Sequence, residues 1–334
     1  MLVSELSEAE LLNCFVPDLP AGQAQLIGPG DDCALIAAPD ARFVTSTDML
    51  VENLDFRRDW STGFEVGQRL AAQNLADCAA MGAQPTSLLV CLGVPRDLEV
   101  QWVKDFTAGI SLRCREAGVG LAGGDLSGAP VIVASATITG NLDGAEPVLR
   151  SGASAGDIIA LAGTLGRSAA GLSLCEAGYI QTEDLYTLPE SLRAIAADSL
   201  RIFKAAEPPL TAGVEARQAG ASAMLDVSDG LLRDLERICQ ASETSARLDS
   251  VLLKHYIEPL TKLAAWLNAD VRQWVLAGGE DHGMLATFPL GVPLPKRFHR
   301  IGECVEDGKT ELYLDKMPAP AVLGWDHFRK ETRE

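Results

Sequence analysis

Hydrophobic and polar positions follow two different periods in the first 140 residues of the chain. Segments 42–47, 88–92 and 131–139 are rich in β-branched residues and alternate apolar with polar positions, which predicts strands. Residues 62–81 and 98–117 instead have the apolar spacing of helices. The first part of the chain is therefore expected to combine a sheet with long helices.

A stretch of turn-forming residues, 140–144, separates this pattern from a second set of apolar segments. That set begins at 157–161, continues through 225–227 and a predicted helix at 231–241, and reaches 274–277. Both halves mix strands with long helices, which predicts the α/β or α+β class. A chain of 334 residues is also long for one hydrophobic core, so we expect two domains.

Five short acidic motifs occur where apolar runs end, each among glycines or other small residues. They are GPGDD at 28–32, TSTD at 45–48, GGD at 123–125, DVSDG at 226–230 and GGED at 278–281. Mg²⁺ binds oxygen ligands, usually one or two carboxylates together with waters and substrate phosphates. Glycine lets backbone N–H groups approach phosphate oxygens. Any one motif is also typical of an ordinary loop, but the five together favour a multi-metal phosphate site.

Asp77 is the most telling of the acidic residues inside a predicted helix. It shares one face of helix 62–81 with the apolar Val66 and Leu70. A carboxylate on an apolar face has to be paired or bound to a metal ion. Asp77 is therefore either a metal ligand or an acid that supports one.

Two further motifs each allow an ordinary and a functional interpretation. Ser46 and Asp48 point to the same face of their strand, and Asp48 is expected to end that strand. This segment is therefore either part of a metal site or a plain turn at the end of a strand. Asp229 stands just before the helix at 231–241 and alone would be an ordinary N-cap. A second acid, Asp226, at the end of an apolar strand favours phosphate and metal binding instead.

The charge of the chain excludes some classes of partner. A net charge of −18 argues against nucleic acid and anionic membranes. It also repels nucleotides unless cations intervene, so an acidic phosphate-binding protein requires Mg²⁺. No run of about 18 apolar residues and no signal peptide are found, which predicts a cytoplasmic protein. The eight cysteines contain no C-x-x-C pair and are expected to be mostly buried free thiols.

Several familiar motifs are absent or incomplete. The glycine-rich segment 163–168 lacks the lysine and the spacing of a P-loop. No H-R-D or D-F-G motif of protein kinases is present. The four histidines form no zinc-binding pair, so zinc is not expected. The charged and aromatic segment 52–60 is either a solvated loop or a site of substrate recognition.

Taken together, the motifs resemble those of the thiamine-monophosphate kinase family, in the superfamily of aminoimidazole ribonucleotide synthetase and selenophosphate synthetase. The resemblance covers nearly the whole chain. Its segments are 28–35, 46–52, 73–83 (QNLADCAAMGA), 123–125, 149–153 (LRSGA), 163–166, 226–231, 278–281 and 324–328 (GWDHF).

The resemblance implies a fold and an activity. An N-terminal domain over residues 1–145, with a mixed sheet, would bind ATP and metal and pair with its copy in a homodimer. A C-terminal α/β domain over residues 146–334 would close over nucleotide and substrate. The activity would be Mg²⁺-assisted transfer of the γ-phosphoryl group of ATP to thiamine monophosphate, which makes thiamine diphosphate.

The resemblance also assigns roles to single residues. The Mg²⁺ ligands, several ions in all, would be Asp32, Ser46, Thr47, Asp48, Asp77, Asp125, Asp226 and Asp229. The ATP contacts would be Gly124, Asp125, Arg150 and Ser228. Asp48, Asp77 and Arg150 would be catalytic, and Asp55, Glu280 and Trp325 would contact the thiamine substrate. The chain departs from the family at two positions: the family often has His at the position of Asp55 and Tyr at the position of His282.

The predicted chemistry needs no general base. A phosphate monoester has a second pKa of about 6, so its attacking oxygen is already ionised at neutral pH. The alternatives are another ATP-dependent synthetase of the same superfamily and a two-metal phosphohydrolase. A selenophosphate synthetase would need a reactive cysteine in an N-terminal glycine-rich loop, whereas residues 1–27 contain only Cys14.

Overall fold

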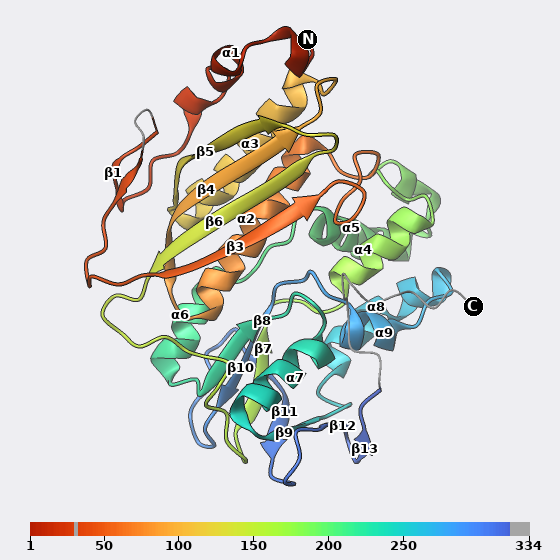
Figure 1. Cartoon of the computed structure of the whole chain (residues 1–334). Coiled ribbons are helices and arrows are strands. Elements are labelled where there is room, and N and C mark those ends of the chain that lie inside the picture. The colour runs from red at the N-terminus through yellow and green to blue at the C-terminus, as the bar shows by residue number, and fades with distance from the viewer. Residues whose placement is uncertain (30–32, 321–334) are drawn as a thin grey trace. The chain divides into compact units, whose positions relative to one another are not determined.

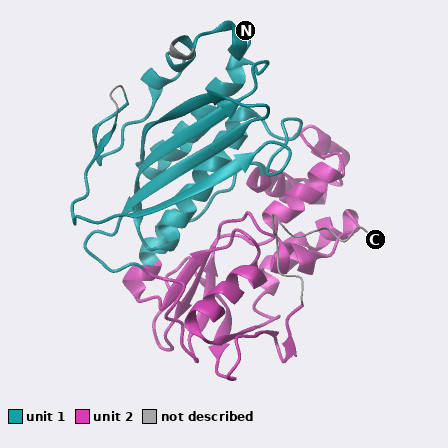
Figure 2. Ribbon diagram, viewed as in Figure 1, with its two compact units in different colours: residues 1–147, 204–215 teal, residues 148–203, 216–334 magenta. Residues whose placement is uncertain are grey.

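The computed structural model describes residues 1–29 and 33–320, which form two compact units (Figure 2). Unit 1 comprises residues 1–147 and 204–215, and unit 2 comprises 148–203 and the chain from 216 onward. The first stretch of unit 1 ends beside the single boundary predicted between residues 145 and 146. Residues 204–215 then return to unit 1, so this unit is not continuous in sequence.

A four-stranded mixed sheet forms the centre of unit 1 (Figure 1). Its order is β3-β6-β4-β5. Strand β6 pairs antiparallel with both β3 and β4, whereas β4 and β5 run parallel. The strands are β3 (Val44–Val51), β6 (Val133–Asn141), β4 (Gln84–Val94) and β5 (Gly120–Gly128).

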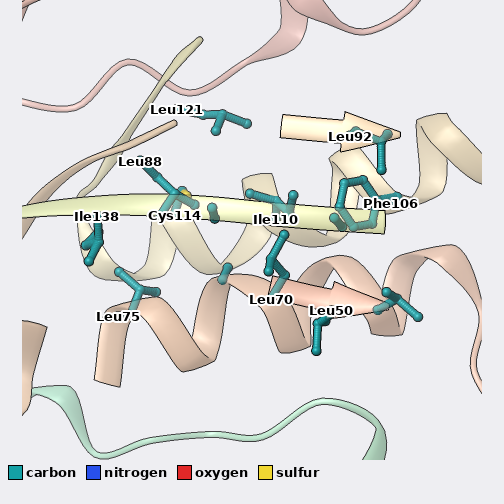
Figure 3. Close-up of a cluster of buried hydrophobic side chains, with 14 of the residues drawn as sticks. Leu50, Leu70, Leu75, Leu88, Leu92, Phe106, Ile110, Cys114, Leu121 and Ile138 are labelled. Atoms are coloured by element: carbon teal, nitrogen blue, oxygen red, sulfur yellow. The ribbon is translucent and has the colours of Figure 1, made fainter. Parts of the chain in front are cut away.

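Helices α2 (Gly63–Ala80) and α3 (Val100–Ala117) lie side by side behind this sheet in Figure 1. Thr62 and Glu65 form a capping box that fixes the start of α2. The helices approach so closely that a Cβ atom at Gly109 would lie 2.0 Å from the backbone oxygen of Phe64. Side chains from both helices and all four strands fill the space between the layers, as Figure 3 shows.

The opposite face of the sheet carries apolar side chains that are exposed. Strand alternation places Met49, Leu89 and Cys91 on this face, and Phe43 precedes β3 in the same phase. Phe43 is 59% exposed, Met49 57% and Leu89 44%, and Cys91 is also exposed. We call this the open sheet face.

Shorter elements complete unit 1. The N-terminal segment runs along the sheet edge, where the Leu121 amide donates to the Pro20 carbonyl. The remaining elements, with α6 continuing into unit 2, are η1 (Val3–Glu5), α1 (Glu8–Leu12), η2 (Val16–Asp18), β1 (Gln25–Ile27), β2 (Leu35–Ile36) and α6 (Leu210–Ala219).

Unit 2 is built on a seven-stranded sheet of order β13-β12-β9-β11-β7-β10-β8. Every residue of β8 and β10 is buried, as expected for strands covered on both faces. The strands are β7 (Ile158–Ala162), β8 (Ala223–Asp226), β9 (Ser245–Leu248), β10 (Met284–Phe288), β11 (His299–Val305), β12 (Leu312–Leu314) and β13 (Met317–Pro318). The helices, with α5 ending in unit 1, are α4 (Arg167–Glu176), η3 (Asp184–Thr187), α5 (Glu190–Lys204), α7 (Leu231–Ser242), α8 (Lys254–Trp266) and α9 (Val271–Ala277).

The mixed α/β class predicted from the sequence is confirmed, but Asp48 and the motif at 123–125 are placed differently from expectation. Strand β3 continues past Asp48 to Val51, so Asp48 does not end the strand. The motif at 123–125 lies inside β5 rather than in a loop. The apolar segment 274–277 belongs to helix α9. No helix among the described residues is long and apolar enough to span a membrane.

Candidate functional site

Asp77 and Ser46 form a direct contact between two of the predicted metal ligands of unit 1. Asp77 lies in the last turn of α2, and its Oδ2 accepts a hydrogen bond of 2.5 Å from the Ser46 hydroxyl on β3. The half-buried Asp77 therefore faces the sheet, as the helix periodicity predicted. A hydroxyl donor of this kind holds the carboxylate in one orientation.

Thr47 and Asp48 point to opposite faces of β3. Exposure alternates along the strand, with Asp48 half-buried on the face of Ser46 and Thr47 exposed on the other. The Thr47 hydroxyl donates to the Ala136 carbonyl at 2.8 Å. Asp48 follows Ser46 on the same face, about 7 Å along the strand. Ser46, Asp48 and Asp77 thus form one polar group, which we call the β3–α2 group.

Asp125 is not brought to this group within unit 1. Asp48 aligns with Ala136 on β6, then with Val90 on β4 and Gly124 on β5. Three strand spacings, about 14 Å, therefore separate Asp48 from Gly124. Leu126 packs against the helix-covered core, so the exposed Asp125 beside it points to the open sheet face.

Asp55 closes the turn that follows β3. Its Oδ2 accepts the Val51 amide at 2.8 Å, and its own amide donates to the Val51 carbonyl. Its backbone carbonyl accepts a hydrogen bond from Arg69. The structure gives Asp55 a local role in this turn, and its contact with substrate stays a prediction.

In unit 2, two motifs about 50 residues apart in sequence lie side by side. The Glu280 amide donates to the Ser228 carbonyl at 2.7 Å, and the His282 amide donates to the Val227 carbonyl at 2.9 Å. A Cβ atom at Gly279 would lie 2.1 Å from the Ser228 oxygen, so only glycine permits this approach. The pairing of β8 with β10, where Asp226 aligns with Met284, sets the register of both loops.

His282 connects the two motifs through its side chain. It is buried, and its Nδ1 lies 2.9 Å from Asp226 Oδ2, while its Nε2 lies 3.9 Å from Glu280 Oε2. Burial by itself lowers the pKa of His282, but the two carboxylates raise it well above the ordinary value. The two carboxylates therefore favour the protonated form of the imidazole.

Asp281 anchors the same loop from the opposite side. The buried carboxylate accepts hydrogen bonds from the Thr164 hydroxyl at 2.7 Å and from the amides of Arg167 and Ser168 at the start of α4. Burial raises the pKa of Asp281 to about 6. The fourth residue of the GGED motif is therefore a structural anchor for the loop.

Asp229 does not cap helix α7, because Gly230 occupies the N-cap position. Arg237 donates to Asp229 Oδ2 at 2.6 Å and to Asp234 Oδ1 at 2.6 Å. Burial raises the pKa of Asp234 to about 7, against the opposing effect of the Arg237 guanidinium. Sequence reasoning missed Arg237, Asp234 and the contacts of His282. The i, i+3 spacing of Asp234 and Arg237 within the predicted helix could have indicated that their side chains form an ion pair.

Four predicted residues remain, and the structure describes two of them, Arg150 and Ser228. Arg150 is exposed in a segment beside β8, where its backbone carbonyl accepts the Ser242 hydroxyl at 3.0 Å. Ser228 is half-buried between Val227 and Asp229. Asp32 and Trp325 lie outside the described residues.

The site residues of unit 1 fit Mg²⁺ that is bound jointly with phosphates. Within the described chain, no three or more His, Cys, Asp or Glu side chains are close enough together to hold a metal ion by themselves. Mg²⁺ needs only one or two protein carboxylates when waters and phosphates complete its coordination. The β3–α2 group offers two carboxylates and a hydroxyl, all of them oxygen donors.

Comparison with known proteins identifies the family. The AIR synthase related protein N-terminal domain matches residues 30–142. The thiamine-monophosphate kinase of Mycobacterium tuberculosis is 40% identical over 326 residues, which covers 98% of this chain and 93% of the relative. This chain belongs to the thiamine-monophosphate kinase family.

Solved structures of thiamine-monophosphate kinases have the same fold. The enzyme from Stenotrophomonas maltophilia K279a superposes with a TM-score of 0.76 at 27% identity, over 96% of this chain and 99% of that chain. AaThiL complexed with AMPPCP and TMP superposes with a TM-score of 0.73 at 28% identity, over 98% and 99% of the two chains. The aminoimidazole ribonucleotide synthetase-like fold predicted from the motifs is therefore confirmed.

Proposed function

We propose that this chain uses ATP to phosphorylate thiamine monophosphate, which yields thiamine diphosphate. The observation that carries the proposal is the 40% identity to a thiamine-monophosphate kinase over 98% of the chain. A relative that was solved with AMPPCP and TMP further supports a nucleotide and a phosphorylated acceptor as ligands. Both substrates are anions, so the site has to reduce the repulsion between them.

The acidic residues are proposed to do this through Mg²⁺. Asp48 and Asp77 would hold the metal ions, which neutralise phosphate charge when bound. The Ser46 hydroxyl orients Asp77 through its hydrogen bond of 2.5 Å. Asp32, Thr47, Asp125, Asp226 and Asp229 stay proposed ligands.

The proposed contacts with the substrates follow the resemblance to the family. Gly124, Asp125, Arg150 and Ser228 would contact ATP, and a guanidinium such as that of Arg150 suits phosphate oxygens. Asp55, Glu280 and Trp325 would contact the thiamine moiety, where a carboxylate and an aromatic ring suit a cationic ring. The acceptor phosphate is ionised at neutral pH, so no side chain has to remove a proton from it.

We also propose that the open sheet face binds a second copy of the chain. Phe43, Met49 and Leu89 are large apolar side chains exposed on this face. A homodimer through the face would cover them. It would also bring Asp125, on the same face, next to the partner. The absence of nucleic-acid and membrane partners stays a proposal from the net charge of −18. Cytoplasmic location also stays a proposal.

The experiment is a stoichiometric assay. We expect the purified chain with Mg²⁺, ATP and thiamine monophosphate to form ADP and thiamine diphosphate one for one, with little ATP turnover when acceptor is absent. Direct in-line transfer predicts inversion at a chiral γ-phosphoryl group and no stable label on enzyme given γ-labelled ATP alone. Acceptor-independent release of phosphate would indicate a phosphohydrolase. ADP formation without thiamine diphosphate would indicate another synthetase.

Substitution of Asp77 tests the metal assignment in the same assay. We expect Asp77→Asn to lower kcat by at least about 10²-fold, the scale of losing one transition-state stabiliser. Asp97→Asn, an exposed acid of unit 1 outside the motifs, is the matched control and should leave kcat unchanged. Near-normal turnover of Asp77→Asn at saturating Mg²⁺ would contradict the assignment.

A further inference from the structure

Arg237 joins two carboxylates at the start of helix α7. Its Nη1 donates to Asp234 Oδ1 and its Nη2 to Asp229 Oδ2, both at 2.6 Å. Asp234 has no exposed surface, and its Oδ2 accepts the amides of Asp229 at 3.0 Å and Gly230 at 3.2 Å. One arm of the guanidinium is therefore fixed to a buried carboxyl group that cannot move away.

The other arm occupies one of the two carboxylate oxygens of Asp229, a proposed metal ligand. Mg²⁺ binds a carboxylate oxygen at about 2.1 Å. A guanidinium nitrogen 2.6 Å from Asp229 Oδ2 and a metal ion on the same oxygen would repel one another strongly, because both are cations. Arg237 is held by Asp234, so it cannot leave Asp229 without losing well-aligned, charge-assisted hydrogen bonds.

We propose that Arg237 competes with the metal ion for Asp229 and thereby weakens metal binding at this carboxylate. The inference rests on the proposed role of Asp229 as a metal ligand. Metal alone then binds poorly at Asp229, and a metal ion that arrives with nucleotide phosphates is favoured, because the phosphates offset the charge of the arginine. Arg237 is a positioning residue in this scheme, since it acts through Asp229.

The test measures Mn²⁺ binding to the full chain by calorimetry, with no nucleotide or acceptor present. We expect Asp229→Asn to weaken one class of sites, and Arg237→Gln to tighten the same class by about tenfold, the scale of removing one nearby charge at a partly exposed position. In the Asp229→Asn background, Arg237→Gln should have no effect. Mn²⁺ affinity is a readout that a merely structural role would not raise.

A matched control separates direct competition from general charge. The Arg233 Nε atom lies 3.8 Å from Asp229 Oδ2, beyond hydrogen-bond distance. Arg233→Gln removes the same charge from the same helix and should change Mn²⁺ affinity less than Arg237→Gln does. Where Arg237→Gln fails to fold, Asp234→Asn combined with Arg237→Gln removes the buried charge as well and gives the same expectation.

The possible outcomes are distinct. Unchanged Mn²⁺ binding in Asp229→Asn would overturn the ligand assignment, and with it this inference, while the kinase assay would still stand on its own. Weakened binding in Asp229→Asn together with unchanged or weaker binding in Arg237→Gln would overturn the competition alone. If Arg233→Gln and Arg237→Gln tighten Mn²⁺ binding equally, the effect comes from net charge, and the proposed direct competition is overturned.

Discussion

At the scale of single residues, the loop around Asp281 combines backbone strain with a buried acid. Glu280 and His282 adopt positive φ angles of 65° and 52°, which are uncommon outside glycine. Such conformations persist only where the surrounding contacts hold them. The hydrogen bonds from Thr164 and from the start of α4 to Asp281 supply those contacts.

The raised pKa of Asp281, about 6, makes its contribution to stability depend on pH. Between the ordinary value and about 6, the folded chain binds more protons at this carboxyl than the unfolded chain, so the free energy of unfolding falls as pH rises through that window. Asp281→Asn removes this dependence. The free energy of unfolding of the variant, relative to that of the unsubstituted chain, should therefore rise by about 1.4 kcal/mol from pH 5 to pH 7.

Urea unfolding at the two pH values measures the difference. Thr164→Val is the matched control, because it removes a hydrogen bond to the carboxyl and leaves the titrating group in place. A difference between Asp281→Asn and the unsubstituted chain that is the same at pH 5 and pH 7 would show that Asp281 is ionised across the whole range.

At the scale of elements, the packing of α2 against α3 depends on glycine. Gly67 approaches the Phe106 carbonyl, and Gly109 approaches the Phe64 carbonyl, so that a Cβ at either position would lie 2.0 Å from backbone oxygen. This close approach keeps both helices against the sheet. It thereby sets the position of Asp77 opposite Ser46.

Gly109→Ala should therefore destabilise the chain, although alanine is the better helix former by about 1 kcal/mol. Overpacking of this kind costs about 1–3 kcal/mol. The exposed neighbour Ala108 gives the control, since Ala108→Gly should lose only the helix propensity. Chemical unfolding measures both, and a more stable Gly109→Ala variant would contradict the close packing.

At the scale of the whole molecule, the open sheet face carries exposed apolar side chains that we propose a second copy of the chain covers. Met49 and Leu89 are exposed on strands whose other faces are buried beneath α2 and α3. A second copy that covers this face would make the strands buried on both sides.

Leu89→Lys should shift the protein from dimer to monomer in sedimentation, because it places a charge in the apolar interface. Leu290, 77% exposed in unit 2, supplies the control Leu290→Lys, which should leave the sedimentation coefficient unchanged. Identical sedimentation of the two variants would exclude the open sheet face as the interface.

The sequence by itself determined the class of fold, the positions of several elements and the family. These follow from local patterns, because the periods of apolar residues specify helices and strands and the acidic motifs are contiguous. The helix predicted at 62–81 and observed as α2 over Gly63–Ala80 is one example. The capping box of Thr62 and Glu65 shows why, since the signal lies within a few residues.

Only the tertiary structure decided how the motifs relate to one another. The pairing of β8 with β10 brings Ser228 to Glu280, and strand order separates Gly124 from Asp48. The partners of Asp229 likewise depend on how α7 begins. Such contacts are set by sheet register and by burial, which join residues far apart in sequence. A local pattern therefore predicts which acidic residues lie near the end of a strand. It does not predict which carboxylate oxygen accepts a hydrogen bond from a given arginine.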